Sequence, residues 1–201
     1  MSYAHPEILV DINWVVNHLN DSNIRIAEVD YDPTANYNLG HVPGAVLYDW
    51  KNDINDPVQR DVFGKDAYQN LLRKTGVNND TTLVLYGDFN NWFAAFAFWI
   101  FKYYGFQDIK IMNGGRKKWI EEDRALTKDV TSYNPGNLNA SEPDQSIRVF
   151  LDGVKSAVQS GKPLVDVRSP KEFSGELLAP PEYPTEHAQR GGHITGAVNI
   201  P

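Results

Sequence analysis

The segment LVLYGDFNNWFAAFAFWIF, Leu83 to Phe101, joins a short apolar run, a polar bend and a long apolar stretch. The apolar run predicts a buried strand, and the stretch from Phe93 predicts a helix that ends near Gly105. In α/β proteins ligands bind at such strand–loop–helix junctions, and the free backbone N–H groups of the helix N-terminus suit an anion or a thiolate. The loop nevertheless contains no Cys, Ser or His and no Gly-Lys-Ser/Thr sequence. The segment therefore predicts an anion-binding loop without a nucleophile.

Strands and helices alternate on both sides of this segment. Short apolar runs predict strands, and apolar residues three or four positions apart predict helices. This alternation predicts an α/β fold with a central parallel sheet and helices on both faces. Before the quoted segment we expect strands within 24–32 and 41–50 and helices within 11–21 and 65–77, and after it a strand at 108–112 and a helix within 114–123.

These elements predict a first domain over residues 1–130. The stretch TSYNPGNLNASEPDQS, 131–146, is polar and contains Pro and Gly, which is typical of an interdomain linker. After it the pattern of helix, strand and turn restarts over 147–201. The sequence therefore predicts two domains joined by a linker.

The restart is an internal repeat. GHVPGAVLYD, beginning at Gly40, and GHITGAVNIP, beginning at Gly192, agree at Gly, His, Gly, Ala and Val, and the preceding strands IAEVDYD and LVDVRSP also correspond. Such a repeat indicates two copies of one structural unit. The second copy reaches only its second strand at Pro201. We therefore expect one whole domain and the N-terminal part of another, with the natural protein continuing past residue 201.

The repeat also places the loop of the second copy. His41 lies 47 positions before Asp88, so the equivalent of Asp88 is expected at about position 240, outside this chain. A nucleophile missing from the first loop would then belong to the second copy. Asp is a favoured N-cap residue, and we interpret Asp88 as the cap of the following helix and not as a catalytic group.

Composition excludes several classes of function. The net charge is -7 and no basic cluster exceeds GGRKKW, so we expect no nucleic-acid partner. The longest apolar run, Trp92 to Phe101, is too short to cross a membrane, and the N-terminus lacks the pattern of a secretory signal, so we expect a cytoplasmic protein. The 201 residues contain no Cys, and the five His show no metal-ligand spacing. We expect neither a metal nor a cofactor.

Three stretches together resemble the rhodanese family: LVDVRSPKEFSGE, RGGHITGAVNIP and IMNGGRKKW. The resemblance covers nearly the whole chain. It is to tandem-domain thiosulfate sulfurtransferases of the bacterial and archaeal type, in which an insertion precedes the Gly-His-Ile turn, as SGELLAPPEYPTEHAQ does here. It implies a rhodanese-like α/β fold for each domain. It also implies that the first domain is catalytically silent, with Asp88 in a vestigial loop where the second domain carries a nucleophilic Cys.

The resemblance also implies a reaction. A Cys thiolate attacks the outer sulfur of thiosulfate, sulfite leaves, and the resulting persulfide passes its sulfur to cyanide or a thiol. Backbone N–H groups at a helix N-terminus would lower the pKa of that thiol. The partners implied are a small-molecule sulfur donor and a thiophilic acceptor, and residues 1–201 alone should be inactive. The oligomeric state stays open.

Arg168 and Lys171 are the candidates for binding the substrate. Arg168 ends the strand LVDVR, at the edge where open parallel sheets bind ligands, whereas the first copy has Asp30 at the matching position. A cation found only in the second copy would favour anionic thiosulfate; alternatively, Arg168 pairs with a neighbouring acid. Mammalian members carry a substrate-binding arginine four positions further on, where this chain has Glu172 beside Lys171. The acids within reach of Arg168 are Asp166, Glu172 and Glu176.

His41 and His193 recur in both copies, and because only one copy is expected to do chemistry, we interpret both as residues that fix a turn by hydrogen bonds. A non-catalytic rhodanese-like binding or regulatory protein, with both loops lacking a nucleophile, is the alternative to a sulfurtransferase. A Cys-based phosphatase is a third possibility, since related folds host such enzymes, but the tandem layout argues against it.

Overall fold

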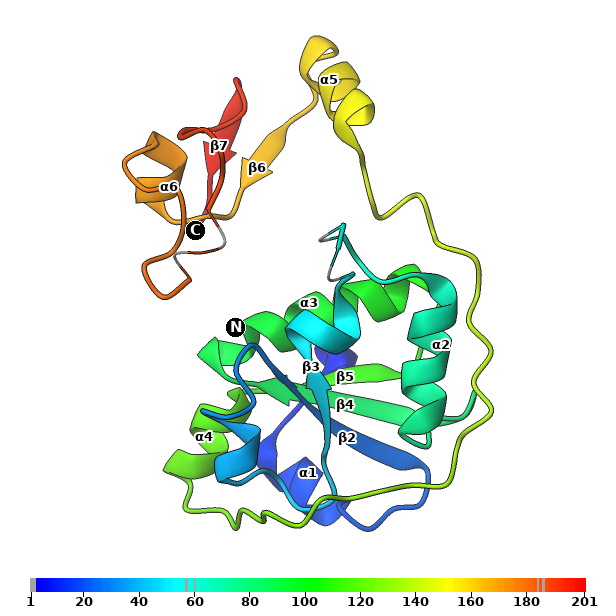
Figure 1. Cartoon of the computed structure of the whole chain (residues 1–201). Helices are drawn as coiled ribbons and strands as arrows, with labels where there is room; N and C mark the ends of the chain where they lie inside the picture. Colours follow the sequence, from blue (N-terminus) through cyan, green and yellow to red (C-terminus); the bar gives the residue numbers. More distant parts are fainter. Residues whose placement is uncertain (1–2, 57, 60, 184, 186) are drawn as a thin grey trace. The chain divides into compact units, whose positions relative to one another are not determined.

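The computed structural model describes residues 3–56, 58–59, 61–183, 185 and 187–201. The chain divides into two compact units, Met1–Ile147 and Arg148–Pro201, and each is described by itself. Both units contain parallel strands and helices (Figure 1). Among the described residues, no helix is both long and apolar enough to cross a bilayer.

The first unit is a five-stranded parallel sheet with the strand order β1-β5-β4-β2-β3, which confirms the predicted α/β fold class. Strand β4, from the segment quoted first, lies between β5 and β2, and every residue in it except Thr82 is buried, as a continuous apolar run predicts. The strands are β1 (Leu9–Val10), β2 (Ile24–Asp30), β3 (Val46–Asp49), β4 (Thr82–Gly87) and β5 (Ile109–Met112). The helices are α1 (Ile12–Asn17), α2 (Lys65–Lys74), α3 (Trp92–Tyr103) and α4 (Gly115–Glu121), with short turns η1 (Pro6–Ile8), η2 (Tyr37–Leu39), η3 (Trp50–Ile54) and η4 (Phe89–Asn91).

Different helices cover the two faces of the sheet (Figure 1). Side chains alternate along a strand, so Ile26 of β2 and its register partner Val84 of β4 share one face. That face packs against α1 and α4, through Ile12, Val15 and Trp119. Helix α3 contacts β2, β4 and β5. By the same alternation, the even-numbered residues at the end of β2 and β4 point toward the side of α1 and α4.

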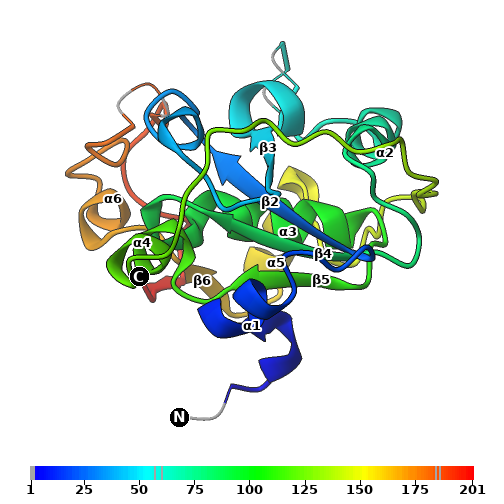
Figure 2. The same ribbon diagram turned by 90° about the horizontal axis from the view of Figure 1, so that it is seen from below.

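The polar segment 131–147 packs along the first unit. It runs in extended conformation past α2 (Figures 1 and 2). Leu138 within it is buried, at 4% exposure. The stretch predicted to be a linker is therefore bonded to the first unit. Among its hydrogen bonds are those from Tyr133 Oη to Gly44 O (2.9 Å), Gly136 N to Arg73 O (2.7 Å), Leu138 N to Val77 O (3.3 Å) and Ser141 N to Tyr104 O (3.0 Å).

The second unit has the elements expected for the start of another copy. They are α5 (Leu151–Gln159), β6 (Leu164–Asp166), α6 (Pro170–Ser174) and β7 (Ala197–Asn199), with β6 and β7 parallel. Helix α5 has no buried residue, and Val165 and Val198 at the centres of the two strands are more than half exposed. Within the described part of this unit, two strands and two short helices thus do not enclose an apolar core.

The internal repeat holds in three dimensions. Val165 pairs with Val198 between β6 and β7, and the equivalent residues of the first copy, Ala27 and Val46, pair between β2 and β3. The turns before the second strand also match, because Gly44 and Gly196 have φ angles of 82° and 85°, which side chains disfavour. The matched register makes Asp166 the equivalent of Glu28 and Arg168 the equivalent of Asp30.

Candidate functional site

The carboxyl edge of the first unit's sheet gathers three acids. Glu28 and Asp30 lie at the end of β2, and Asp88 follows directly after β4. Because Glu28 is the register partner of Tyr86, alternation puts all three carboxyl groups toward the side of α1 and α4. Glu28 and Asp30 are fully buried, and Asp88 is 9% exposed. Burying an acid costs free energy unless the acid is paired, hydrogen-bonded or neutral, so the contacts of each of the three matter.

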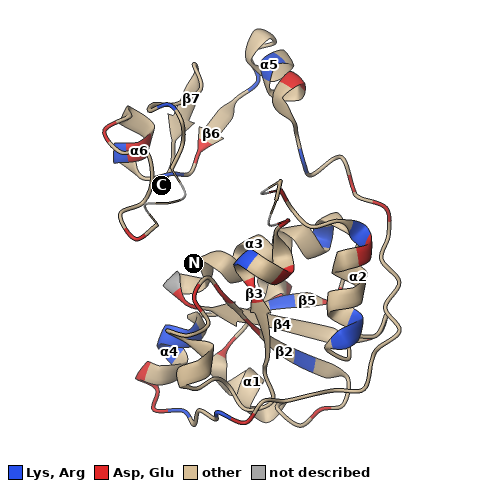
Figure 3. Ribbon diagram, viewed as in Figure 1, with Lys and Arg blue, Asp and Glu red and all other residues tan. Residues whose placement is uncertain are grey.

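Glu28 is paired with Arg116 from the basic start of α4, which is blue in Figure 3. Glu28 Oε1 lies 2.7 Å from Arg116 Nη1, and Tyr86 Oη donates to Oε2 at 2.5 Å. Burial raises the pKa of Glu28, while the charge of Arg116 and the hydrogen bond from Tyr86 oppose that rise. The guanidinium also donates to Asn36 O at 3.1 Å. This ion pair therefore joins β2, α4 and the segment before η2.

Asp30 and Asp88 have fewer contacts. Asp30 Oδ2 accepts from Tyr37 N at 3.0 Å, and Asp88 Oδ2 accepts from Asn36 Nδ2 at 2.7 Å. The Oδ1 atoms of both acids are buried and have no hydrogen-bond partner among the residues that the structure describes. Burial, then Glu28, then Asp88 raise the pKa of Asp30 to about 8. Burial and then Glu28 raise the pKa of Asp88 to about 6.

The loop after β4 is held by its own side chains. Asn90 and Asn91 have positive φ angles of 57° and 67° and form the turn that leads into α3. Asn91 Oδ1 accepts from Gly87 N at 3.0 Å, and Asn91 Nδ2 donates to Met112 O at 2.7 Å. The helix-capping role predicted for Asp88 is wrong, because Asn91 precedes α3 and the Asp88 carboxylate bonds to Asn36 instead. With the Gly87 amide occupied and three acids beside it, this edge suits neither an anion nor a thiolate.

The equivalent edge of the second unit carries a cation. Arg168 Nη2 lies 2.6 Å from Asp166 Oδ2 and donates to Gly192 O at 2.8 Å, and Arg168 Nε donates to Asp166 Oδ1 at 3.0 Å. The hydrogen bond to Asp166 raises the pKa of Arg168, and the same bond lowers the pKa of Asp166. Arg168 thus forms an ion pair with one of the three neighbouring acids, and its side chain stays 36% exposed. The structure brings Arg168 against Asp166 and the turn at Gly192.

Lys171 and Glu172 lie on the short helix α6 that follows. Lys171 Nζ is 2.9 Å from Glu176 Oε1, and its side chain is 62% exposed. Glu172 is buried and forms a capping box with Ser169, in which the Ser169 hydroxyl and the Glu172 carboxylate each accept from the other residue's backbone N–H. Glu172 is therefore part of the helix start, and no described contact joins Lys171 to Arg168.

His41 and His193 make the same contact in the two copies. His41 stacks on Tyr37 with a ring-centroid distance of 3.7 Å, and its Nδ1 lies 3.0 Å from Tyr37 O. His193 stacks on Phe173 at 3.6 Å, and its Nδ1 lies 2.8 Å from Phe173 O. These contacts confirm the predicted turn-fixing role. They also show that the insertion of the second copy lies between an aromatic residue and its histidine.

Comparison with known proteins identifies the family. Residues 11–122 match the family described as the rhodanese-like domain. The chain belongs to the rhodanese family. A relative from Thermus thermophilus, named as the sulfur carrier protein TtuD, is 52% identical over all of this chain and 72% of its own length. A relative from Saccharopolyspora erythraea, whose name contains the words thiosulfate sulfurtransferase, is 50% identical over 98% of this chain and 70% of its own length.

A solved structure shares the rhodanese fold. The crystal structure of SseA from Escherichia coli, described in connection with 3-mercaptopyruvate sulfotransferases, superposes with a TM-score of 0.81 at 25% identity. The match covers 96% of this chain and 74% of SseA. Family and fold therefore agree with the resemblance drawn from the sequence, and the two relatives are named as a sulfur carrier protein and a thiosulfate sulfurtransferase.

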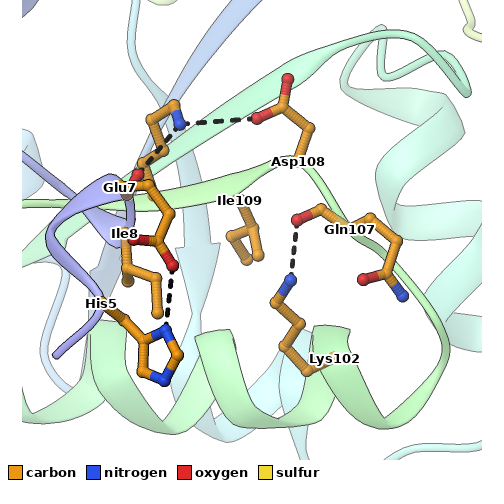
Figure 4. Close-up of a pocket in the computed structure, with 8 residues that line it drawn as sticks. His5, Glu7, Ile8, Lys102, Gln107, Asp108 and Ile109 are labelled. Carbon is orange, nitrogen blue, oxygen red and sulfur yellow. Dashed lines mark hydrogen bonds and ion pairs between the residues drawn. The ribbon is translucent and has the colours of Figure 1, made fainter.

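A pocket of about 390 Å³ in the first rhodanese unit lies away from these acids. It opens beside the start of β5, at the amino edge of the sheet, and Figure 4 shows Lys102, Asp108 and His5 around it. Lys102 Nζ donates to Gln107 O at 2.7 Å, and His5 Nδ1 lies 3.0 Å from Glu7 Oε1, so these polar groups are already paired. Within the described residues, no group of three or more His, Cys, Asp or Glu side chains is placed to hold a metal ion.

Sequence reasoning missed the groups that define the acidic edge. Glu28, Tyr86 and Arg116 were not singled out, although one signal was present. Glu28 occupies an inward-facing position in the apolar strand IRIAEVD, and a charged residue at such a position calls for a partner. The pattern does not say which cation supplies that partner, because Arg116 lies 88 positions further along the chain.

Proposed function

We propose that this chain is part of a thiosulfate sulfurtransferase, which moves sulfane sulfur from thiosulfate to cyanide or a thiol through a cysteine persulfide. The observation that carries the proposal is the exchange of Asp30 for Arg168 at register-matched strand ends. The first edge is acidic, whereas the second carries an arginine whose side chain is partly exposed, which suits an anionic donor. The name of the Saccharopolyspora relative supports thiosulfate as that donor.

In the proposed reaction, a cysteine thiolate attacks the outer sulfur of thiosulfate, the S–S bond of the donor breaks, and sulfite leaves with the electron pair. The acceptor then attacks the outer sulfur of the persulfide, and the thiolate is regenerated. The chain contains no cysteine, so we place the nucleophile at about position 240, in the rest of the second unit. The greater length of the relatives and the exposed strands β6 and β7 support this placement.

Activity measurements test this proposal directly. Residues 1–201 should produce thiocyanate from thiosulfate and cyanide no faster than buffer, because no thiol is present. The chain extended by the residues that follow Pro201 in its natural protein should turn over, and replacing the cysteine near about position 240 by Ser should abolish turnover. Turnover by residues 1–201 would contradict the proposal. An inactive extended chain would favour the non-catalytic binding protein instead.

Arg168 is proposed to contribute to donor binding in the extended chain. Arg168→Ala should raise the pKa of the nucleophilic thiol and weaken thiosulfate use, because a nearby cation favours both the thiolate and the anionic donor. Arg168→Lys should recover only part of the effect, since an ammonium lacks the planar fork that Arg168 presents to Asp166. The measurements are the rate of thiol alkylation against pH and a melting curve.

The matched control for Arg168 is Lys171→Ala, which removes a neighbouring cation that is 62% exposed and pairs with Glu176. Lys171 remains a weaker candidate for donor binding, and we expect its removal to change thiosulfate use less than Arg168→Ala does. If Arg168→Ala lowers the melting temperature while the thiol pKa and the rate per folded molecule stay the same, Arg168 serves only the ion pair with Asp166.

The name of the Thermus relative favours a second version of the final step. A sulfur carrier hands its sulfur to another protein, whereas a sulfurtransferase tested with cyanide uses a small acceptor. Both versions share the persulfide, so they differ only in the acceptor. Comparing sulfur transfer from the loaded protein to cyanide, to a small thiol and to a protein thiol would separate them.

A further inference from the structure

Among the three acids of the first unit's carboxyl edge, Asp30 has the fewest contacts that would stabilise a negative charge. Glu28 is paired with Arg116 and accepts a hydrogen bond from Tyr86. Asp88 accepts from the Asn36 side chain and retains 9% exposure. Asp30 is fully buried, its one described hydrogen bond comes from Tyr37 N, and its Oδ1 is without a partner. An ionised carboxyl group in this position would be costly, whereas a protonated one would not.

We propose that Asp30 carries a proton at neutral pH and that this buried proton maintains the folded arrangement of the first unit's carboxyl edge. The proposal concerns a pH-sensitive element of the fold and does not depend on the sulfurtransferase assignment. When the proton leaves, a further negative charge forms beside Glu28 and Asp88. The repulsion then opposes the packing that holds the carboxyl groups of Glu28 and Asp88 beside Asp30.

The charges around Asp30 support a neutral carboxyl group. Acids outnumber cations here even if both Arg116 and His41 are counted as positive. Burial, Glu28 and Asp88 also raise the pKa of Asp30 to about 8, in agreement with the contacts. The titratable and charged groups facing Asp30 from the surrounding elements are Glu28 on β2, Tyr86 and Asp88 at the end of β4, Asp49 opposite Asp30 on β3, Arg116 on α4, and Tyr37 and His41 around η2.

The sign of the pH effect follows from linkage. An aspartate in an unfolded chain titrates near about 3.9. From that pH up to about 8, the folded state binds one more proton at Asp30 than the unfolded state does. The contribution of Asp30 to stability is therefore complete in acid and falls as pH rises, until it levels off above about 8. In this window the group increases the unfolding equilibrium constant about tenfold per pH unit.

The test compares the chain with its Asp30→Asn variant. Asn has the shape of a neutral aspartic acid and cannot ionise. The unfolding equilibrium constants of both chains are measured by urea unfolding at about pH 5, 6 and 7. The constant of the unvaried chain, divided by that of Asp30→Asn, should rise about tenfold per pH unit. Asp80→Asn is the matched control, because Asp80 is exposed and makes no described side-chain contact. The control should keep the slope of the unvaried chain.

A second measurement keeps the proposal testable even if Asp30→Asn does not fold. Carbon-13 NMR of the aspartate carboxyl carbons should reveal one resonance with a midpoint near pH 8 in the unvaried chain. That resonance should persist in Asp88→Asn, although its midpoint falls as one like charge is removed. Equal pH slopes for the unvaried chain and Asp30→Asn would overturn the proposal. Assignment of the high midpoint to Asp88 would also overturn it. So would a specific stabilisation of the chain at pH 8 by sodium or ammonium ions, because a bound cation and not a proton would then neutralise Asp30.

Discussion

Arg116→Ala is expected to lower the free energy of unfolding of the first unit by about 3–5 kcal/mol. The Arg116 side chain is 10% exposed and Glu28 is fully buried, so the substitution leaves a buried carboxylate without its cation. It also removes the hydrogen bond to Asn36 O. The loss should shrink at low pH, because burial already raises the pKa of Glu28 and protonation then removes the uncompensated charge. Urea unfolding at two pH values measures both effects.

The neighbouring residue supplies a matched control. Lys117 lies 3.8 Å from Glu121 on the same helix, with both side chains more than half exposed. Lys117→Ala should change stability by less than about 0.5 kcal/mol, as exposed pairs do. The double variant Glu28→Gln with Arg116→Met should recover much of the loss, since it removes the charge along with its partner. If Arg116→Ala costs no more than Lys117→Ala, the ion pair does not hold α4 to the sheet.

Gly136→Ala is expected to destabilise the first unit by about 3 kcal/mol, the upper part of the range for overpacking. A Cβ atom on Gly136 would lie 2.0 Å from the backbone oxygen of Val77 and 2.5 Å from its carbonyl carbon. Backbone atoms cannot swing aside as a flexible side chain can. The variant therefore has to break the bonds by which Gly136 N and Leu138 N hold the segment to α2 and to Val77 just after it. Thermal unfolding monitored by circular dichroism would report the loss.

The control for this second variant is Gly64→Ala. Gly64 has a φ angle of -75°, and a Cβ atom there would meet nothing within 4 Å. It precedes α2, where Ala is a poorer cap than Gly, so a cost below about 1 kcal/mol is expected. Equal costs for the two substitutions would mean that residues 131–147 behave as a free linker. A large difference would show that the segment is part of the folded unit.

The sequence by itself determined the elements and their type. The continuous apolar run of β4, the alternation of strands with helices and the Gly-His-x-x-Gly turns are local patterns, and each is read within a few residues. The conformations that these turns adopt in the structure have the same local causes. Gly44 and Gly196 adopt positive φ angles because the turn requires them, and His41 and His193 each bond to a carbonyl that the turn brings near. The repeat in turn indicated the family.

Only the tertiary structure decided which groups meet at the carboxyl edge. Strand order places β4 beside β2, and this brings Asp88 to Asn36, 52 positions away, and Arg116 to Glu28, 88 positions away. The same packing attached residues 131–147 to the first unit, although their composition is that of a linker. It also gave Asp88 a side-chain partner other than the helix that the local pattern suggested. The physical reason is that periodicity and turn chemistry act over a few residues, whereas a buried charge is stabilised by whichever group the folded chain places beside it.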